Sequence, residues 1–343
     1  MRCLYLFHGL WTSSRVLSVA AGALATVASM AAPSFAGTIT FGSGGNQFNM
    51  EFVTIGNANN AADTTGSPNP AGAVGYTYEI GKFEVSEDMI TRYNANFGTA
   101  SSLVITQDNR GTAKPATSVS WNEAARFVNW LNTSTGNQAA YKFTNTGVND
   151  DIALWASDDA GYDVNNKYRN SLAKYVLPSY NEWYKAAYYD PNKSGGAGYY
   201  DYATGSNSAP TAVASGTGTG TAVYGQSYGQ GPADVTQAGG LSPYGVMGLG
   251  GNVFEWEESS SDLANSSGSS SRGIRGGDWS TEAGRLSSSS RRSFFPSLEN
   301  PTFGFRVASL SSSAPPAVPE PSMMVIGTLF GLGGLMAKRR MKK

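Results

Sequence analysis

The sequence predicts an α+β fold in a single compact domain, low in regular secondary structure and with long loops. Three observations lead to this prediction. Glycine supplies 42 of the 343 residues and only 14 % of residues are charged, whereas 40 % are hydrophobic, enough for a sizeable core. Segments with strand alternation and segments with helical periodicity both occur. Periodic, aromatic-rich segments resume after each Gly- and Ser-rich stretch, which favours surface loops over an interdomain linker.

Strands are predicted in the first third of the chain. Residues 38–55 contain Ile39 and Phe41 and then a second apolar alternation, which is typical of one or two strands. Residues 57–71 are polar and contain two prolines, so we expect a loop there. Residues 76–85, which read YTYEIGKFEV, alternate again and predict a further strand.

Three helices are predicted from their N-terminal caps. Ser86 precedes two acidic residues that suit the first turn of a helix, while Ser120 with Glu123 and Ser179 with Glu182 form capping boxes. Apolar residues then recur at helical spacing, so each helix should bury one face. The residues on these faces are Ile90, Tyr93 and Phe97; Ala124, Phe127, Val128 and Leu131; and Trp183, Ala186 and Ala187.

The N-terminus has the pattern of a secretory signal at residues 1–36. Two arginines lie before an apolar, Ala-rich run at 16–32, and Ser-Phe-Ala at 34–36 predicts cleavage before Gly37 by signal peptidase. The alternative is a transmembrane anchor, which the shortness of the apolar run disfavours.

The C-terminus has three parts after a Pro/Ser/Ala linker at 311–317. A Pro-Glu-Pro triplet opens residues 318–343, an apolar segment follows at 322–337, and a basic cluster closes the chain. This order resembles the PEP-CTERM sorting signal of Gram-negative bacteria. The resemblance implies export through the inner membrane, a C-terminal membrane segment before processing by an exosortase, and a final place at the cell surface or in the extracellular matrix. The alternative is a plain membrane anchor.

Charge and composition exclude several classes of function. The net charge is −1, but seven of the 24 basic residues and one of the 25 acidic residues, Glu320, lie at the two ends, so 17 basic residues remain against 24 acidic ones, a net charge of −7. Nothing in this balance indicates a nucleic-acid partner. The one cysteine, Cys3, and the one histidine, His8, both lie in the predicted leader. The processed chain could therefore form no disulfide, no Cys/His zinc or copper site and no Ser-His-Asp triad.

Six segments, in order, resemble the formylglycine-generating enzyme (sulfatase-modifying factor) domain. The resemblance implies that residues 37–310 form one domain with a variant of the C-type lectin fold. The segments are YEIGKFEVS (78–86), PATSVSWNEAARFVNWLN (115–132), LPSYNEWYKAAY (177–188), GNVFEW (251–256), IRGGDW (274–279) and GFRVA (304–308).

The active enzymes of that family oxidise a substrate cysteine with two cysteines of their own and a copper ion. The matching positions here are Thr281 and Leu286. Neither side chain offers a soft sulfur ligand for Cu(I) or a thiolate for exchange. Formylglycine generation is therefore excluded.

Elementary physics gives the remaining motif residues structural roles. Gly276 and Gly277 should allow a turn or a close backbone approach, and Arg275 and Arg306 should be buried arginines bonded to carbonyls or carboxylates. The tryptophans expected in or near the core are Trp121, Trp130, Trp183, Trp256 and Trp279.

The family resemblance also implies structural calcium. The carbonyls of Gly251 and Val253 and the carboxylate of Glu255 match one such site, but Gly248 stands where relatives carry Asn or Asp. Hard oxygen ligands suit Ca²⁺, and the missing side chain would weaken binding. The alternative is that Glu255 pairs with an arginine.

Two main hypotheses of function follow, with a purely structural envelope protein as a third. The first is a non-catalytic surface or matrix protein that binds a glycan or another protein through a lectin-like scaffold. The Tyr- and Gly-rich segments 195–202 and 224–229 would supply contacts. The second is an enzyme with carboxylate chemistry in the same cleft. The candidate ligand-binding residues are Asp278, Trp279, Glu282 and Tyr244, and Asp234 joins them as a candidate acid or base.

Overall fold

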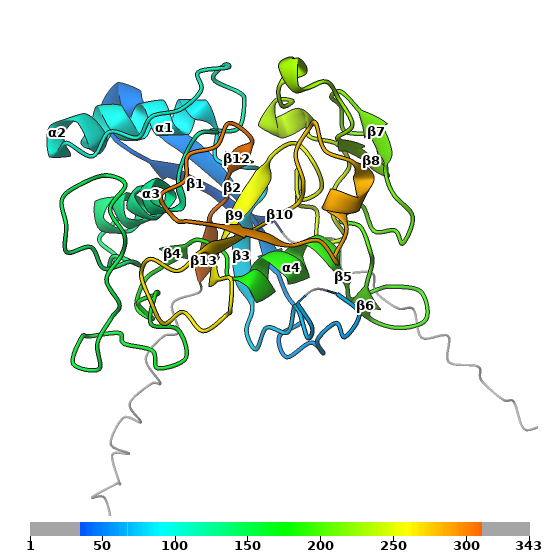
Figure 1. Cartoon of the computed structure of the whole chain (residues 1–343), viewed down its shortest axis with the longest axis horizontal. Helices are drawn as coiled ribbons and strands as arrows, with labels where there is room; N and C mark the ends of the chain where they lie inside the picture. The colour runs from blue at the N-terminus through cyan, green and yellow to red at the C-terminus, as the bar shows by residue number, and fades with distance from the viewer. Residues whose placement is uncertain (1–34, 67, 311–343) are drawn as a thin grey trace, which may run out of the picture. The chain divides into compact units, whose positions relative to one another are not determined.

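Two sheets organise the protein in the computed structural model, which describes residues 35–66 and 68–310 (Figure 1). The last strand that the structure describes, Ala308–Leu310, lies between Tyr78–Gly81 and Tyr175–Val176, so the two ends of the described domain meet in one sheet. The five-stranded sheet has the order β1 (Phe35–Phe41), β2 (Phe48–Ile55), β3 (Tyr78–Gly81), β13 (Ala308–Leu310) and β4 (Tyr175–Val176). The four-stranded sheet has the order β11 (Arg292–Phe294), β10 (Arg272–Arg275), β9 (Phe254–Ser260) and β12 (Phe303–Gly304).

Two short ladders complete the strand structure. β5 (Tyr189–Asp190) pairs with β6 (Gly198–Tyr199), and β7 (Thr211–Val213) pairs with β8 (Thr221–Val223). The α-helices are α1 (Glu87–Tyr93), α2 (Thr99–Ser101), α3 (Trp121–Ser134) and α4 (Tyr180–Tyr188). A π-helical turn, Asn94–Gly98, joins α1 to α2, and 3-10 turns lie at Gly44–Asn46, Tyr228–Gln230, Val235–Gln237 and Ala283–Leu286.

The predicted N-terminal strands are confirmed, with one correction. β1 and β2 pair antiparallel from Gly37–Phe52 to Phe41–Phe48, and the apolar side chains of β2 are buried. The strand predicted at 76–85 is shorter, because β3 ends at Gly81. Beyond this point the chain pairs with a different segment, since the amide of Val85 donates to the carbonyl of Phe305.

The three predicted helix caps are confirmed. The Ser86 side chain accepts from the Met89 amide, and both capping boxes are complete, with Ser120 and Ser179 each bonded reciprocally to the glutamate three residues on. Helices α1 and α3 lie beside the five-stranded sheet (Figure 1), where Phe48 of β2 stacks on Phe127 of α3 with ring centroids 6.2 Å apart. The predicted apolar stripe of α3 is buried.

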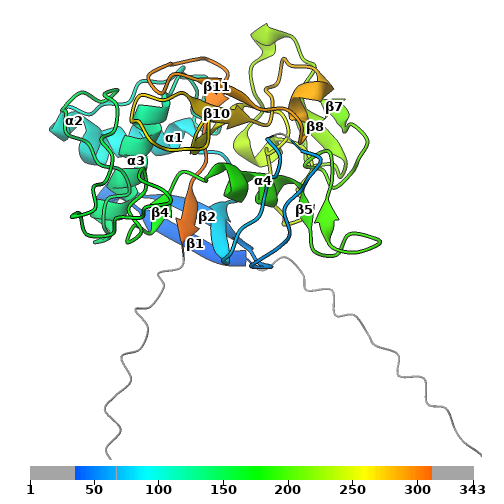
Figure 2. The same ribbon diagram turned by 60° about the horizontal axis from the view of Figure 1, so that its bottom comes forward.

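Helix α4 is buried on nearly every side, so its predicted apolar face was too narrow. The helix lies between the two sheets (Figure 2). The hydroxyl of Tyr78 in β3 donates to the carbonyl of Glu182, and the indole nitrogen of Trp183 donates to a carboxylate oxygen of Glu255 in β9 at 2.7 Å. All five tryptophans expected in the core are at most 5 % exposed.

The predicted end segments lie almost wholly outside the described residues. The expected cleavage point before Gly37 falls within β1, at the place where the β1–β2 register shifts. Among residues 35–66 and 68–310, no helix is long and apolar enough to cross a membrane. The linker and the predicted sorting signal at 311–343 stay predictions.

Candidate functional site

Glu255, the carboxylate predicted to bind calcium, is fully buried and holds an arginine. Arg306 donates to both of its oxygens, with Nε 2.6 Å from Oε2, and the indole of Trp183 donates to Oε2 as well. The same guanidinium donates to the carbonyls of Gly81 and Met247, each at 2.9 Å. The pairing of Glu255 with an arginine, left open by the sequence, is thus present, and Arg306 has the buried structural role predicted for it.

A second buried carboxylate, Glu84, lies beside this pair. It is 1 % exposed, and Asn252 Nδ2 donates to its Oε1 at 2.9 Å. Its other oxygen, Oε2, is buried and has no hydrogen-bond partner among the described residues. A Cβ added at Gly248 would stand 2.6 Å from Glu84 Oε1. The Glu84 carboxylate therefore fills the space that the Asn or Asp side chain implied at position 248 would need.

The unpaired carboxylate oxygen of Glu84 suits a hard cation. Two carboxylates, Glu84 and Glu255, share one guanidinium, so the buried cluster is short of one positive charge when both are ionised. Glu84 Oε2 is an acceptor without a donor, and an ion would satisfy it. A bound Ca²⁺ would have Glu84 as a carboxylate ligand, with the carbonyls of Gly251 and Val253 as the ligands predicted from the sequence. Glu255 could be a ligand only if its carboxylate bound the ion and Arg306 at the same time. Groups of three or more His, Cys, Asp or Glu arranged for a metal do not occur in the described part of the chain.

Glu84 should make the stability of the metal-free protein depend on pH. Burial, with help from the charge of Glu255 and against that of Arg306, raises the pKa of Glu84 to about 8. The contribution of Glu84 to the free energy of unfolding is therefore complete below about 4.5, the pKa of its carboxyl group in the unfolded chain. This contribution is lost as the pH rises through 8. Glu84→Gln mimics the protonated form, so in EDTA its stability relative to the wild type should rise by roughly 3 kcal/mol between pH 5 and pH 8.

Urea unfolding at each pH tests this expectation. Glu282→Gln is the matched control, because the Glu282 side chain is 79 % exposed and its loss should leave the profile unchanged. Lys185, whose pKa burial lowers to about 8, is protonated in both states over most of this window and interferes little. Parallel profiles for the wild type and Glu84→Gln would contradict the assignment.

The turn at residues 276–286 occupies the place of the family's reactive cysteines. Gly276 and Gly277 have φ values of +92° and +77°, and a Cβ at Gly277 would stand 2.7 Å from a methyl carbon of Leu286. The predicted need for glycine is thus confirmed at both positions. Leu286 is 1 % exposed and packs into the turn, while the Thr281 hydroxyl bonds to the amide and carbonyl of Asp278. Both side chains close the turn and leave no reactive group there.

Trp279 lies within this turn and anchors a neighbouring loop. Its indole nitrogen donates to the Tyr228 carbonyl at 3.0 Å, and its own carbonyl accepts from the Gln226 amide at 2.8 Å. The Trp279 ring is fully buried, with the Tyr228 ring 5.7 Å away on a 31° tilt and the Arg110 guanidinium 5.0 Å from its centroid. Tyr228 itself is 56 % exposed. The aromatic surface open to solvent is therefore Tyr228, which Trp279 supports from beneath.

A cavity of about 380 Å³ opens at Tyr228. The residues that line it are Arg110, Lys114, Tyr228, Gly229, Gln230, Gly231 and Pro232. Arg110 contacts Asp108 at 3.0 Å, and Lys114 contacts Asp234 at 3.0 Å. The volume lies at the lower end of the range typical of small-molecule sites, about 300–1,000 Å³. We call this the Tyr228 pocket.

A family model described as the sulfatase-modifying factor enzyme 1-like domain matches residues 36–310. The chain belongs to this family. Among solved structures, Treponema denticola variable protein 1 is 20 % identical, with a TM-score of 0.51 over 79 % of this chain and 98 % of that one. CarF is 19 % identical, with a TM-score of 0.50 over 76 % of this chain and 98 % of its own. Both likenesses are likenesses of fold. None of the curated proteins compared matches the chain.

Within this sulfatase-modifying factor domain, the predicted ligand-binding residues do not form one cluster. Asp278 is 4 % exposed, and its Oδ1 accepts from the amide and hydroxyl of Ser280, so it closes a local turn. Glu282 points into solvent, with Arg285 3.9 Å away. Tyr244 is 6 % exposed and donates to Gly56 O and Asn57 Oδ1. Of the candidate residues, only Trp279 and Asp234 lie near the Tyr228 pocket. Trp279 lies beneath the pocket, and Asp234 lies beside it.

Sequence reasoning did not single out four residues of the Tyr228 pocket and the Glu84 cluster. Arg110 and Lys114 lie in a polar loop more than a hundred residues before Tyr228, and no motif links them. Tyr228 falls inside the predicted contact segment 224–229, so composition located it but could not single it out. Glu84 stood within the quoted motif at 78–86, but its burial follows only from the packing of the domain.

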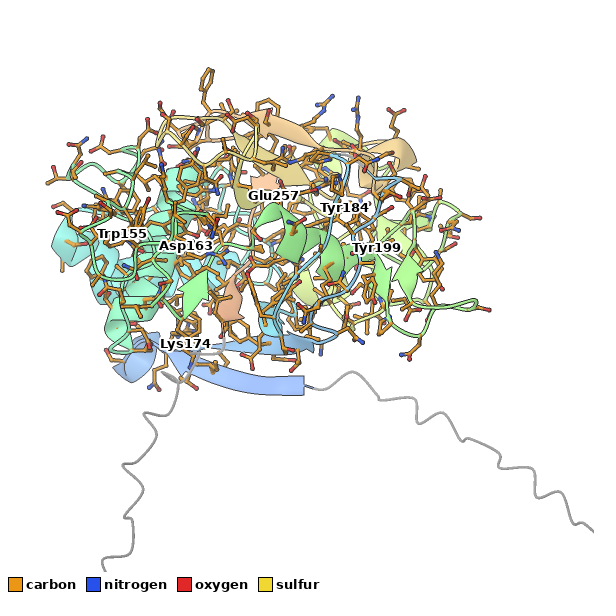
Figure 3. The ribbon with its side chains drawn as sticks, turned by 90° about the horizontal axis from the view of Figure 1, so that it is seen from below. Trp155, Asp163, Lys174, Tyr184, Tyr199 and Glu257 are labelled. Atoms are coloured by element: carbon orange, nitrogen blue, oxygen red, sulfur yellow. The ribbon has the colours of Figure 1, made fainter. Side chains whose placement is uncertain are left out.

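The other carboxylates that gather in the domain do so around arginines. Glu257 accepts from Arg275 and Arg291, each at 2.7 Å, in the layer between β9 and α4 (Figure 3). Tyr184 of α4 lies next to this pair, with its ring centroid 5.0 Å from the Arg275 guanidinium. Arg275 thereby has the buried role predicted for it. The buried glutamates of these arginine clusters thus lie inside the core, whereas the carboxylates beside the Tyr228 pocket are Asp108 and Asp234.

Proposed function

We propose that this protein is an exported, non-catalytic surface or matrix protein that uses its sulfatase-modifying factor domain to bind a glycan or another protein. The observation that carries the proposal is the Tyr228 pocket, whose exposed aromatic ring is held rigidly by Trp279. Thr281 and Leu286 stand where the family's active enzymes carry cysteines, which supports a role other than thiol oxidation. Export is supported by the patterns of residues 1–36 and 318–343.

A binding screen of the exported protein tests this function. The protein would be probed against glycans and exopolysaccharide fractions, with Ca²⁺ and with EDTA. We expect retention on at least one polysaccharide, with the polymer recovered intact. Cleavage of the bound polymer would favour the carboxylate enzyme, and no retention on any fraction would favour the purely structural role.

Processing can be checked on the same material by mass spectrometry. We expect the exported protein to begin at Gly37 and to lack the basic residues that close the chain. A protein that keeps residues 1–36 or 318–343 in the extracellular fraction would contradict the predicted sorting.

Calcium binding is part of the proposal, with Glu84 as its side-chain ligand. Adding Ca²⁺ at one hundred times its Kd should stabilise the protein by about 2.7 kcal/mol, equivalent to a rise in Tm of roughly 5 °C or more. Glu84→Gln should abolish the rise, whereas the exposed-site control Glu282→Gln should keep it. A wild-type Tm that is the same in Ca²⁺ and in EDTA would remove calcium from the proposal.

A further inference from the structure

We infer that the Tyr228 pocket binds an uncharged saccharide, stacked on the free face of Tyr228 and hydrogen-bonded by Arg110 and Lys114. This inference rests on the proposed function and names the ligand class of the same site. It combines the exposed ring, the charge balance of the pocket and its concave form.

The exposed ring provides a platform for the apolar face of a sugar. Tyr228 is 56 % exposed, although Trp279, which is itself fully buried, packs against it. Glycines flank the ring in the chain, at 229 and 231, and the second has a φ of +73°. Neither glycine has a side chain that could cover the ring. Trp279 also fixes the loop backbone through its bond to the Tyr228 carbonyl, so little ordering entropy is lost on binding.

The charges of the pocket are already balanced. Arg110 Nη1 contacts Asp108 and donates to the carbonyl of Pro301, and Lys114 Nζ contacts Asp234 and donates to the carbonyl of Pro232. Two cations thus face two carboxylates. The part of the chain between the two predicted end segments also has a net negative charge. An anionic ligand would gain little Coulomb energy here and would be repelled at long range. A polyol can instead accept from the remaining N–H groups and donate to the carboxylates.

The concave form favours a small unit over a protein surface. Stable protein interfaces bury about 800 Å² on each partner, mostly on broad faces. A cavity of about 380 Å³ with one exposed aromatic ring suits one end or one short segment of a glycan chain. We therefore favour a saccharide over a protein as the occupant, and retention of a protein alone would count against the inference.

The test compares uncharged polysaccharides with an anionic one. The exported protein would be passed over immobilised dextran, mannan and galactan, which are uncharged, and over alginate, which is anionic. We expect retention on an uncharged polymer, with an affinity that changes less than about twofold between 50 and 500 mM NaCl, because screening acts only on charge.

Variants at the ring locate the binding. Tyr228→Ala should weaken retention about tenfold, equivalent to the loss of one stacking contact, whereas Tyr228→Phe should keep it. Phe295→Ala is the matched control, since Phe295 is an exposed aromatic residue, 69 % exposed, that is not among the residues lining the pocket. Tyr228 makes its bond to Trp279 through the backbone carbonyl, so the alanine variant should fold.

The outcomes separate this inference from the proposed function. Retention only on alginate, lost with salt, would overturn the ligand class. Retention on an uncharged polymer that Tyr228→Ala leaves intact would overturn the site while leaving the function. Absence of retention on all four polymers would overturn this inference, whereas the proposed function would fall only if no glycan fraction and no protein were retained either.

Discussion

Replacing Arg169 by methionine should destabilise the domain by about 3–5 kcal/mol, since it strands two buried carboxylates. Arg169 Nε contacts Glu258 at 2.7 Å, and its two terminal nitrogens each contact Glu182 at 2.9 Å. All three side chains are at most 7 % exposed. A loss of this size is a large part of the total stability of an ordinary domain, about 5–15 kcal/mol.

A second buried arginine, which makes no ion pair within residues 35–66 and 68–310, offers a control. Arg272 lies between the rings of Trp121 and Tyr168, 4.3 and 4.1 Å from their centroids, and donates to the carbonyls of Gly268 and Ser270. Arg272→Met leaves two carbonyls without a donor but no carboxylate without a cation. Its cost should be smaller, roughly 1–3 kcal/mol. Chemical unfolding followed by circular dichroism compares the two, and equal losses would contradict the electrostatic explanation.

The stability that these ion pairs provide should depend on pH in the acid range. Burial alone would raise the pKa of Glu182, but the charge and hydrogen bonds of Arg169 lower it to about 2. A depressed carboxylate pKa stabilises the fold above the unfolded value, near 4.5, and this stabilisation is lost as pH falls towards 2. The difference between the wild type and Arg169→Met should therefore shrink from pH 7 to pH 3. Should Arg169→Met not fold, the triple variant with Glu182→Gln and Glu258→Gln should recover it, because no ionised carboxylate remains.

Arg306→Met should have the second large effect, again about 3–5 kcal/mol. Arg306 is completely buried and joins β9 to two other segments, through Glu255 and through the carbonyls of Gly81 and Met247. Arg306→Lys keeps the charge but loses the planar fork that reaches all three acceptors. We expect it to recover less than half of the loss.

A double-mutant cycle measures the interaction energy between Arg306 and Glu255. Arg306→Met combined with Glu255→Gln should be more stable than Arg306→Met alone, because the stranded charge is gone. Additive losses would show that Arg306 acts through packing and its two carbonyls rather than through Glu255. Stability would be measured in EDTA, so that cation binding does not enter the comparison.

Local chemistry was enough to predict helices α1, α3 and α4 and the first strands of the fold. Each of these three helices begins where a serine can accept from a free amide, at Ser86, Ser120 and Ser179, and this depends on a few consecutive residues. The same holds for the alternation of β2 and for the positive φ of Gly276 and Gly277. The absence of cysteine after residue 3 is likewise readable without a structure, and it is the ground on which the sequence argues against formylglycine generation.

Contacts between distant segments were decided only by the tertiary structure. The sequence could not tell that Glu84 lies against Gly248, or that Arg110 and Lys114 meet Tyr228, because nothing in their spacing records the pairing. It also placed Asp278, Glu282 and Tyr244 together, whereas backbone turns and burial separate them. Caps and turns are set by neighbours in the chain, but a pocket is set by which loops pack side by side, and that is a property of the whole core.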